Sequence, residues 1–137
     1  MNSFTLDIEK DGGIFTTDVD FWDLKTKSYK KCSLVLDTGA SVTTVSKNIL
    51  RRLGYSISNT PVSKVTTGSK IEYLNKIYVK KMKLGEFELE NTEVHAHDFP
   101  PDCYFYGLLG LNIFTKFDVN FLFSQNMIEF TPIKAIY

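Results

Sequence analysis

An aspartate directly follows an apolar segment in residues 34–41, which read LVLDTGAS. Asp37 is therefore expected at the end of a buried strand, where a carboxylate could serve as a general acid or base. Gly39, two residues later, lets the backbone approach closely, so that its amide could hydrogen-bond the carboxylate. The tripeptide Asp37-Thr38-Gly39 also occurs in ordinary turns, and a second feature is needed before catalysis can be inferred.

That second feature is the apolar, glycine-punctuated segment 106–114, which reads YGLLGLNIF. The two motifs, in this order, resemble those of the retropepsin-like aspartic proteases. In that family an apolar strand ends in Asp-Thr-Gly-Ala/Ser, and two apolar residues and a glycine later open a short helix. Here Leu108, Leu109 and Gly110 match the second motif, and 111–116 would be the helix. The resemblance covers about 14–131 and looks closest to the small bacterial members of the group.

The resemblance implies a role for each residue of the first motif. Asp37 corresponds to the catalytic aspartate, and Thr38 to the threonine that ties two active-site loops together across a dimer. Gly39 corresponds to the glycine whose amide holds the aspartates coplanar. Ala40 stands where retroviral members also have alanine and pepsin-like enzymes usually have serine.

The same comparison implies a flap and two departures. Thr67, Gly68 and Ser69 fall where the tip of the flap hairpin would lie. Retroviral members commonly have an acid two residues after the first glycine and an arginine after the second motif's glycine, but here those positions are Ser41 and Leu111. Both partners of that pairing are missing together, so we expect a different packing to hold the loop.

Aspartic-protease chemistry needs two carboxylates that share one proton. This chain has one Asp-Thr-Gly, and Asp118 is followed by Val119 and Asn120, which cannot make that turn. The second carboxylate must then come from another copy, so the resemblance implies a homodimeric aspartic endopeptidase that acts on peptides or proteins without a metal or organic cofactor. The alternative is a catalytically weak or silent dimerisation module with the same fold. A barrel that binds a small ligand would leave the order of the motifs unexplained.

Other polar residues are weaker candidates. His95 and His97 share a strand face and Asp98 follows, but no third metal ligand has a suggestive spacing, so we interpret them as surface histidines near a loop. Cys103 lies in a loop-like segment with no base that the sequence can place beside it. It and Cys32 form no CxxC motif and are expected to be reduced thiols.

The elements that position these motifs are mostly short strands. Ser46 is a suitable N-cap and Gly54 a suitable C-cap for one helix over 47–53. The alternation of apolar residues shifts phase at Lys80 and Lys81, which predicts a β-bulge. The phenylalanines near the end of the chain are expected to be core. Strands are predicted at 14–21, 29–36, 62–66, 71–79, 87–96, 117–123 and 127–131.

Length and composition fit this pattern. The 137 residues, 43% of them hydrophobic, suit one soluble domain over 1–137 with an all-β, closed acid-protease barrel and one or two short helices. Sixteen basic residues balance sixteen acidic ones, which argues against a nucleic-acid partner. No apolar run reaches the ~20 residues of a membrane span, and the first residues do not resemble a signal peptide, so we expect a cytoplasmic protein.

Overall fold

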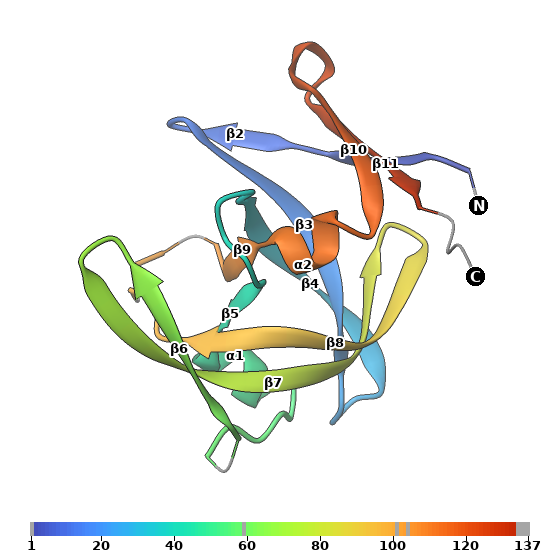
Figure 1. Ribbon diagram of the computed structural model, residues 1–137. Helices are drawn as coiled ribbons and strands as arrows, with labels where there is room; N and C mark the ends of the chain where they lie inside the picture. The colour runs from blue at the N-terminus through green and yellow to red at the C-terminus, as the bar shows by residue number, and fades with distance from the viewer. Residues whose placement is uncertain (1, 59, 101, 104, 134–137) are drawn as a thin grey trace.

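The computed structural model describes residues 2–58, 60–100, 102–103 and 105–133 (Figure 1). Its helices are α1 (Lys47–Arg52), α2 (Leu111–Phe114) and the 3₁₀ turn η1 (Phe123–Gln125). Within the described ranges, none of these helices is long and apolar enough to cross a membrane. The strands are β1 (Phe4–Asp7), β2 (Glu9–Asp11), β3 (Ile14–Asp23), β4 (Ser28–Leu36), β5 (Thr44–Ser46), β6 (Val62–Thr67), β7 (Lys70–Leu84), β8 (Phe87–His97), β9 (Gly107–Leu109), β10 (Phe117–Leu122) and β11 (Met127–Pro132).

The larger sheet closes on itself. Its strand order is β2-β3-β4-β9-β5-β8-β7-β6, and an additional pairing between β3 and β7 joins Phe21 to Met82. These two side chains are fully buried, as are Val19, Leu34 and Val79, so the closed part of the sheet surrounds a dry core. The predicted all-β, acid-protease-type class is confirmed.

Strand β9 lies between β4 and β5, although it comes much later in the chain. Leu34 and Leu36 of β4 pair in parallel with Gly107 and Leu109, and Val45 of β5 pairs with Gly107 from the other side. The second sequence motif is therefore inserted between the two strands that flank Asp37. This insertion is what brings the two motifs together.

The phase shift predicted in β7 is present, but its form differs from a one-residue bulge. Val79 pairs with Thr92 and Lys81 with Glu90, so the register of β7 against β8 is unchanged across Lys80. The Lys80 N–H donates instead to the Tyr55 hydroxyl (3.2 Å), and Asn91 on β8 adopts a positive φ of 48°. Both strands thus shift phase at the same level, which keeps apolar side chains on the core side above and below it.

Helix α1 ends one residue earlier than predicted and lacks one expected contact. Ser46 is its N-cap, but the Ser46 side chain makes no capping hydrogen bond. The C-terminal prediction is confirmed: Gly54 has a φ of 92° and its N–H donates to Arg51 O (3.0 Å), while Tyr55 N–H donates to Leu50 O (2.9 Å). This pair of bonds is a Schellman motif.

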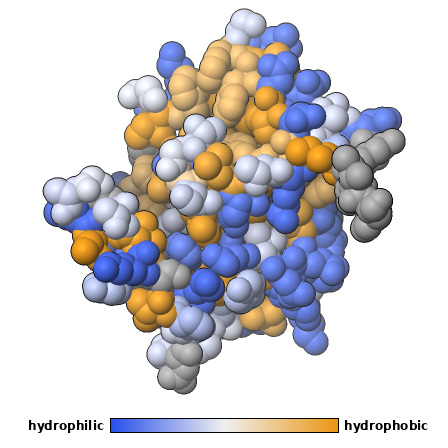
Figure 2. Space-filling model, viewed as in Figure 1, coloured by the Kyte–Doolittle hydropathy of each residue, from blue (hydrophilic) through white to orange (hydrophobic). Residues whose placement is uncertain are grey.

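A second, three-stranded sheet has the order β1-β11-β10, and the two strands before residue 14 were not predicted. Phe130 at its centre stacks on Phe4 (5.4 Å between centroids) and is fully buried, as expected for core. Phe123 corrects that expectation, because 55% of it is exposed and it packs on Phe15 at the surface (5.1 Å). Figure 2 shows apolar residues gathered on this upper part of the molecule.

Candidate active site

Asp37 begins a tight turn at the end of β4. Its N–H donates to Leu109 O on β9 (3.0 Å), which continues the strand pairing up to the carboxylate. The Gly39 N–H donates to Asp37 Oδ1 (2.9 Å), and the Ala40 N–H donates to Asp37 O (3.2 Å). A Cβ on residue 39 would lie 3.2 Å from Asp37 Oδ1, so glycine fits this approach best. The carboxylate is half-buried and fixed in direction.

The second motif supports this turn from behind. The Leu111 N–H donates to Ala40 O (2.8 Å), and the Asn112 N–H donates to Ser41 O (3.1 Å). A Cβ on Gly110 would lie 2.7 Å from the Val42 carbonyl carbon and 2.9 Å from Ala40 O, closer than real contacts allow. The first turn of α2 and the Asp37 turn therefore form one hydrogen-bonded unit.

Asn112 is the residue that the sequence analysis missed. Its Oδ1 accepts from both the N–H (2.8 Å) and the hydroxyl (2.9 Å) of Thr43, and its Nδ2 donates to Glu93 O on β8 (2.8 Å). The Thr43 hydroxyl in turn accepts from the Gly110 N–H (3.0 Å). These contacts supply the different packing expected where Ser41 and Leu111 replace a charged pair. An amide two residues after a buried glycine was the only local signal.

Four of the predicted site residues line a cleft of about 360 Å³, whereas Thr38, Leu109, Gly110 and the hairpin-tip residues 68–69 are not part of its described lining. Asp37, Gly39, Ala40 and Leu108 lie at one side, and the β6–β7 hairpin lies at the other. Gly68 and Ser69 form the two-residue tip of that hairpin, with Gly68 at a φ of 57° and Thr67 paired with Lys70 beside it. Figure 1 shows this hairpin (green) projecting from the closed part of the larger sheet. The remaining lining residues are Ser41, Val42, Thr44, Val65, Thr66, Glu72, Leu74, His95, His97 and Phe99.

Both histidines line this cleft, which corrects their interpretation as surface residues near a loop. His95 is only 7% exposed, and its Nε2 lies 3.4 Å from Glu93 Oε2 without a well-aligned hydrogen bond. Burial lowers the pKa of His95, and the nearby Glu93 carboxylate opposes this only in part. His97 is half-exposed, with Nε2 3.9 Å from Glu72 Oε2. Among the described residues no group of three or more His, Cys, Asp or Glu could hold a metal ion.

The lowered pKa of His95 predicts a loss of stability in acid. An unfolded chain takes up a proton at the ordinary value of about 6.5, whereas the folded chain resists protonation until a lower pH. The free energy of unfolding should therefore fall as the pH drops below about 6.5, and this fall should be smaller in His95→Gln. Urea unfolding of both proteins at several pH values measures it, with His97→Gln as the control. Identical pH slopes for wild type and His95→Gln would contradict the assignment.

Two other residues named in the sequence-based prediction, Thr38 and Asp118, do not line this cleft. The exposed Thr38 makes no side-chain hydrogen bond within the described residues, which leaves its hydroxyl available. Asp118 lies exposed on β10, paired with Thr131, and does not line the cleft. Glu72 is the other carboxylate among the described lining residues, but it comes from the hairpin and not from a turn like that of Asp37.

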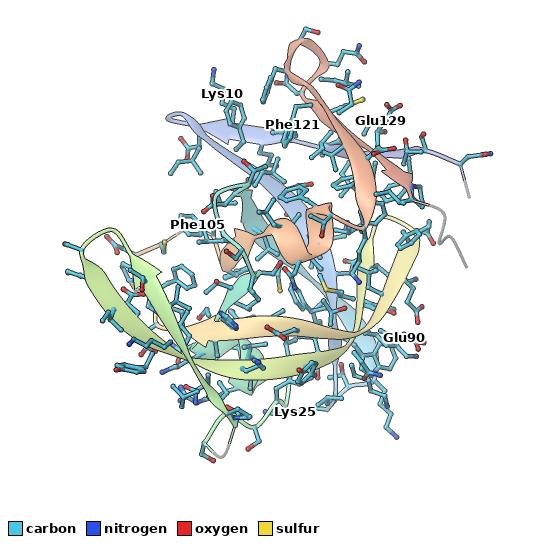
Figure 3. The ribbon with its side chains drawn as sticks, in the orientation of Figure 1. Lys10, Lys25, Glu90, Phe105, Phe121 and Glu129 are labelled. Carbon is cyan, nitrogen blue, oxygen red and sulfur yellow. The ribbon has the colours of Figure 1, made fainter. Side chains whose placement is uncertain are left out.

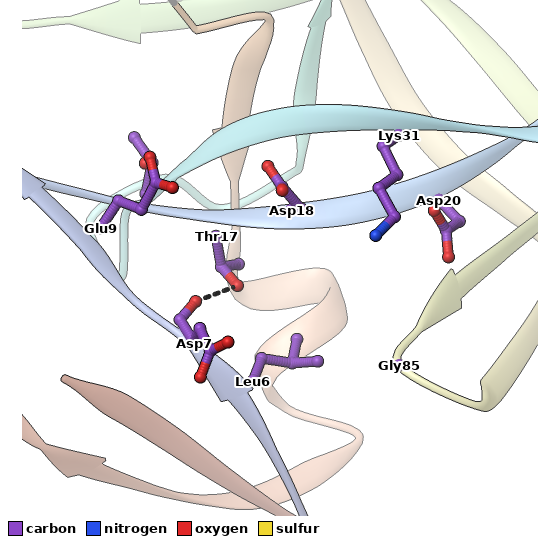
Figure 4. A pocket seen from close by; sticks show the side chains of 9 residues that line it. Leu6, Asp7, Glu9, Thr17, Asp18, Asp20, Lys31 and Gly85 are labelled. Carbon is purple, nitrogen blue, oxygen red and sulfur yellow. Dashed lines mark hydrogen bonds between the residues drawn. The ribbon is translucent and has the colours of Figure 1, made fainter. Parts of the chain in front are cut away.

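The remaining candidates do not join this site. A hollow of about 250 Å³ between β1, β3 and β4 is lined by acidic side chains and Lys31, with Thr17 donating to Asp7 O (2.9 Å; Figure 4), and it shares no residue with the Asp37 cleft. Burial raises the pKa of the Cys32 thiol to about 12, which makes it a poor nucleophile. Cys103 is half-exposed and does not line the cleft.

Comparison with known proteins agrees with the geometry. Residues 26–116, more than half of the chain, match the family described as gag-polyprotein putative aspartyl protease. The fold is similar to that of a retropepsin-like aspartic protease from Rickettsia conorii, with a TM-score of 0.67 and 17% sequence identity. That similarity covers 93% of this chain and 89% of the other. No curated protein sequence matches this chain.

Proposed function

Because the chain belongs to the gag-polyprotein putative aspartyl protease family, we propose that it is an aspartic endopeptidase whose active form is a homodimer. One observation carries the proposal: the Gly39 N–H and the backbone bonds to β9 and α2 hold the Asp37 turn at the side of a cleft of about 360 Å³. Thr38, Gly39 and Ala40 are proposed to support that carboxylate, and 67–69 to form the tip of a flap over the substrate.

The proposed reaction uses Asp37 of both chains. Two carboxylates about 3 Å apart share one proton, because both cannot be ionised at that separation. The ionised carboxylate takes a proton from a water molecule as its oxygen attacks the peptide carbonyl carbon. The protonated carboxylate donates to the carbonyl oxygen, which gives a neutral tetrahedral intermediate. The carboxyl that took the proton from water then donates it to the peptide nitrogen, while the other carboxylate takes a proton from a hydroxyl of the intermediate, so that the C–N bond breaks and a carboxylic acid forms.

Exposed apolar residues near Asp37 support the proposed homodimer. Leu111 is 37% exposed and follows the glycine that holds the Asp37 turn, while Leu36 directly precedes Asp37 and is only partly buried. Ile14 on β3 and Phe123 on η1 are also exposed apolar residues. Exposed apolar residues of this kind favour contact with another protein surface. A copy related by a two-fold axis through the surface around Leu111 would bring the two Asp37 turns together.

Cleavage of peptides tests the proposed activity. We expect the protein to cleave members of a diverse peptide mixture between acidic and neutral pH, as detected by mass spectrometry. A statine-type transition-state mimic should block that cleavage, because its hydroxyl occupies the position of the attacking water. Complete absence of cleavage would instead favour the dimerisation module.

Mixing experiments test the shared site. If each active site needs one Asp37 from each chain, a threefold excess of Asp37→Asn chains should lower the activity per wild-type chain to about one quarter after subunit exchange. The loss follows because most wild-type chains then sit in mixed dimers that hold a single carboxylate. Activity assayed immediately after mixing provides the control. Constant activity per wild-type chain after full exchange would contradict the shared site.

A further inference from the structure

Glu72 is the feature of the cleft that the proposed chemistry leaves unused. It lies on β7, just after the hairpin tip, and its side chain lines the same cleft as Asp37. The Glu72 side chain is 36% exposed, and its Oε2 is 3.9 Å from His97 Nε2, too far for a hydrogen bond. Its carboxylate oxygens therefore remain available to a ligand in the cleft.

The charge of the cleft is one-sided. Its described lining contains the carboxylates of Asp37 and Glu72 but neither lysine nor arginine. Lys76, a nearby cation on β7, lies 3.9 Å from Glu93 Oε1 and is not part of the lining. An acidic substrate side chain would meet like charge here, whereas a basic one would meet the Glu72 carboxylate.

The lining near Glu72 is largely apolar or uncharged. His95 is nine-tenths buried and lines the cleft, and its Nε2 has no aligned hydrogen-bond partner among the described residues. That nitrogen is itself buried and lies 3.4 Å from Glu93 Oε2, so His95 forms part of the lining and is not a hydrogen-bonding contact for a ligand. The surrounding Val65, Leu74 and Phe99 are apolar and could pack against the aliphatic stem of a long side chain.

We propose that Glu72, with these apolar neighbours, forms a substrate subsite for a basic side chain, that of lysine or arginine. The inference rests on the proposed peptidase function, because the cleft is the place where a substrate chain would lie beside Asp37. Glu72 acts as the charged contact that selects the side chain, and the apolar lining packs against the aliphatic stem of that side chain. In the proposed homodimer each chain contributes one such subsite, so a basic residue is favoured on either side of the cleaved bond.

Matched peptides test this preference by kcat/KM. Peptides that differ at one position, with Lys, Arg, norleucine, Gln or Glu, should be cleaved fastest when that residue is basic. Glu72→Gln should lower kcat/KM for the Lys and Arg peptides by about tenfold or more and change the norleucine value little, since it replaces a charged acceptor with a neutral amide. Glu90→Gln is the control, because Glu90 is exposed on β8 away from the hairpin tip (Figure 3).

A binding assay separates the subsite from the catalytic step. In the Asp37→Asn background, fluorescence anisotropy of labelled Lys and norleucine peptides gives Kd without cleavage, and the further change Glu72→Gln should weaken only the Lys peptide, by about tenfold. If the protein cleaves peptides but Glu72→Gln does not change the ratio of kcat/KM between the Lys and norleucine peptides, the subsite is overturned and the proposed peptidase function stands. Lys-selective binding that depends on Glu72, in a protein that cleaves nothing, would support the subsite and overturn the proposed peptidase. Preference for the Glu peptide would also overturn the subsite.

Discussion

Asp37→Asn is expected to lower the rate of peptide cleavage by about a thousandfold or more while leaving the fold intact. Asparagine keeps the shape of the side chain, and its Oδ1 can still accept from the Gly39 N–H. In the native chain the distance from Gly39 N to Asp37 Oδ1 is 2.9 Å. Asparagine cannot exchange a proton with the attacking water or with a second carboxylate. The loss should therefore appear in kcat, measured with a peptide that the wild type cleaves.

Two controls make this result specific to Asp37. Asp118→Asn makes the same chemical change on an exposed strand position and should leave cleavage unchanged. The midpoint of thermal unfolding of Asp37→Asn should stay close to that of the wild type, because the change alters no buried apolar contact. Cleavage by Asp37→Asn near the wild-type rate would mean that the catalytic acid lies elsewhere.

Gly107→Ala is expected to have the largest effect on stability, on the order of 3 kcal/mol. Gly107 is buried between β4 and β5, and a Cβ there would overlap the backbone oxygen of Thr44 and lie 3.0 Å from Val45 Cα. Those neighbours are backbone atoms of a paired strand, so they cannot turn away as a side chain would. Urea unfolding measures the change in the free energy of unfolding.

Gly13→Ala is the matched comparison for Gly107→Ala. Gly13 has a φ of 88°, but a Cβ there would meet nothing within 4 Å. Its cost should be about 1 kcal/mol, from the left-handed backbone alone. Equal losses for the two substitutions would show that the close approach of β9 to β5 is not what selects glycine at 107.

Patterns of neighbouring residues were enough to predict some strand and helix ends. The apolar run before Asp37 and the glycine after Leu53 mark a strand end and a helix end by their own chemistry, and both predictions are confirmed. β1 and β2 were missed because they are short. β2 reads Glu-Lys-Asp and is exposed throughout, so only its pairing with β3 makes it a strand.

The sequence predicted only those parts of the candidate site that belong to the two motifs or to the hairpin tip. Thr43 and Asn112 are 69 positions apart, and nothing near either residue indicates that one holds the other. Glu72 and His95 reach the cleft through the register of β7, β8 and β5, which pairs His95 with Lys76 and Thr44. The alternation of β8 marks Glu93, His95 and His97 as one face, but only the closed sheet brings His95 and His97 of that face to the cleft.

The insertion of β9 between β4 and β5 also orders events during synthesis. A ribosome makes Asp37 long before it makes Gly107, and until then β4 and β5 have no strand between them. The Asp37 turn also lacks the amides of Leu111 and Asn112 until these residues have emerged. Contacts this distant in sequence form late, because a long loop must close first. If the proposed function is correct, a nascent chain therefore cannot assemble its active site before residues 107–112 have been made. Its own unfolded segments are then not cleaved during synthesis.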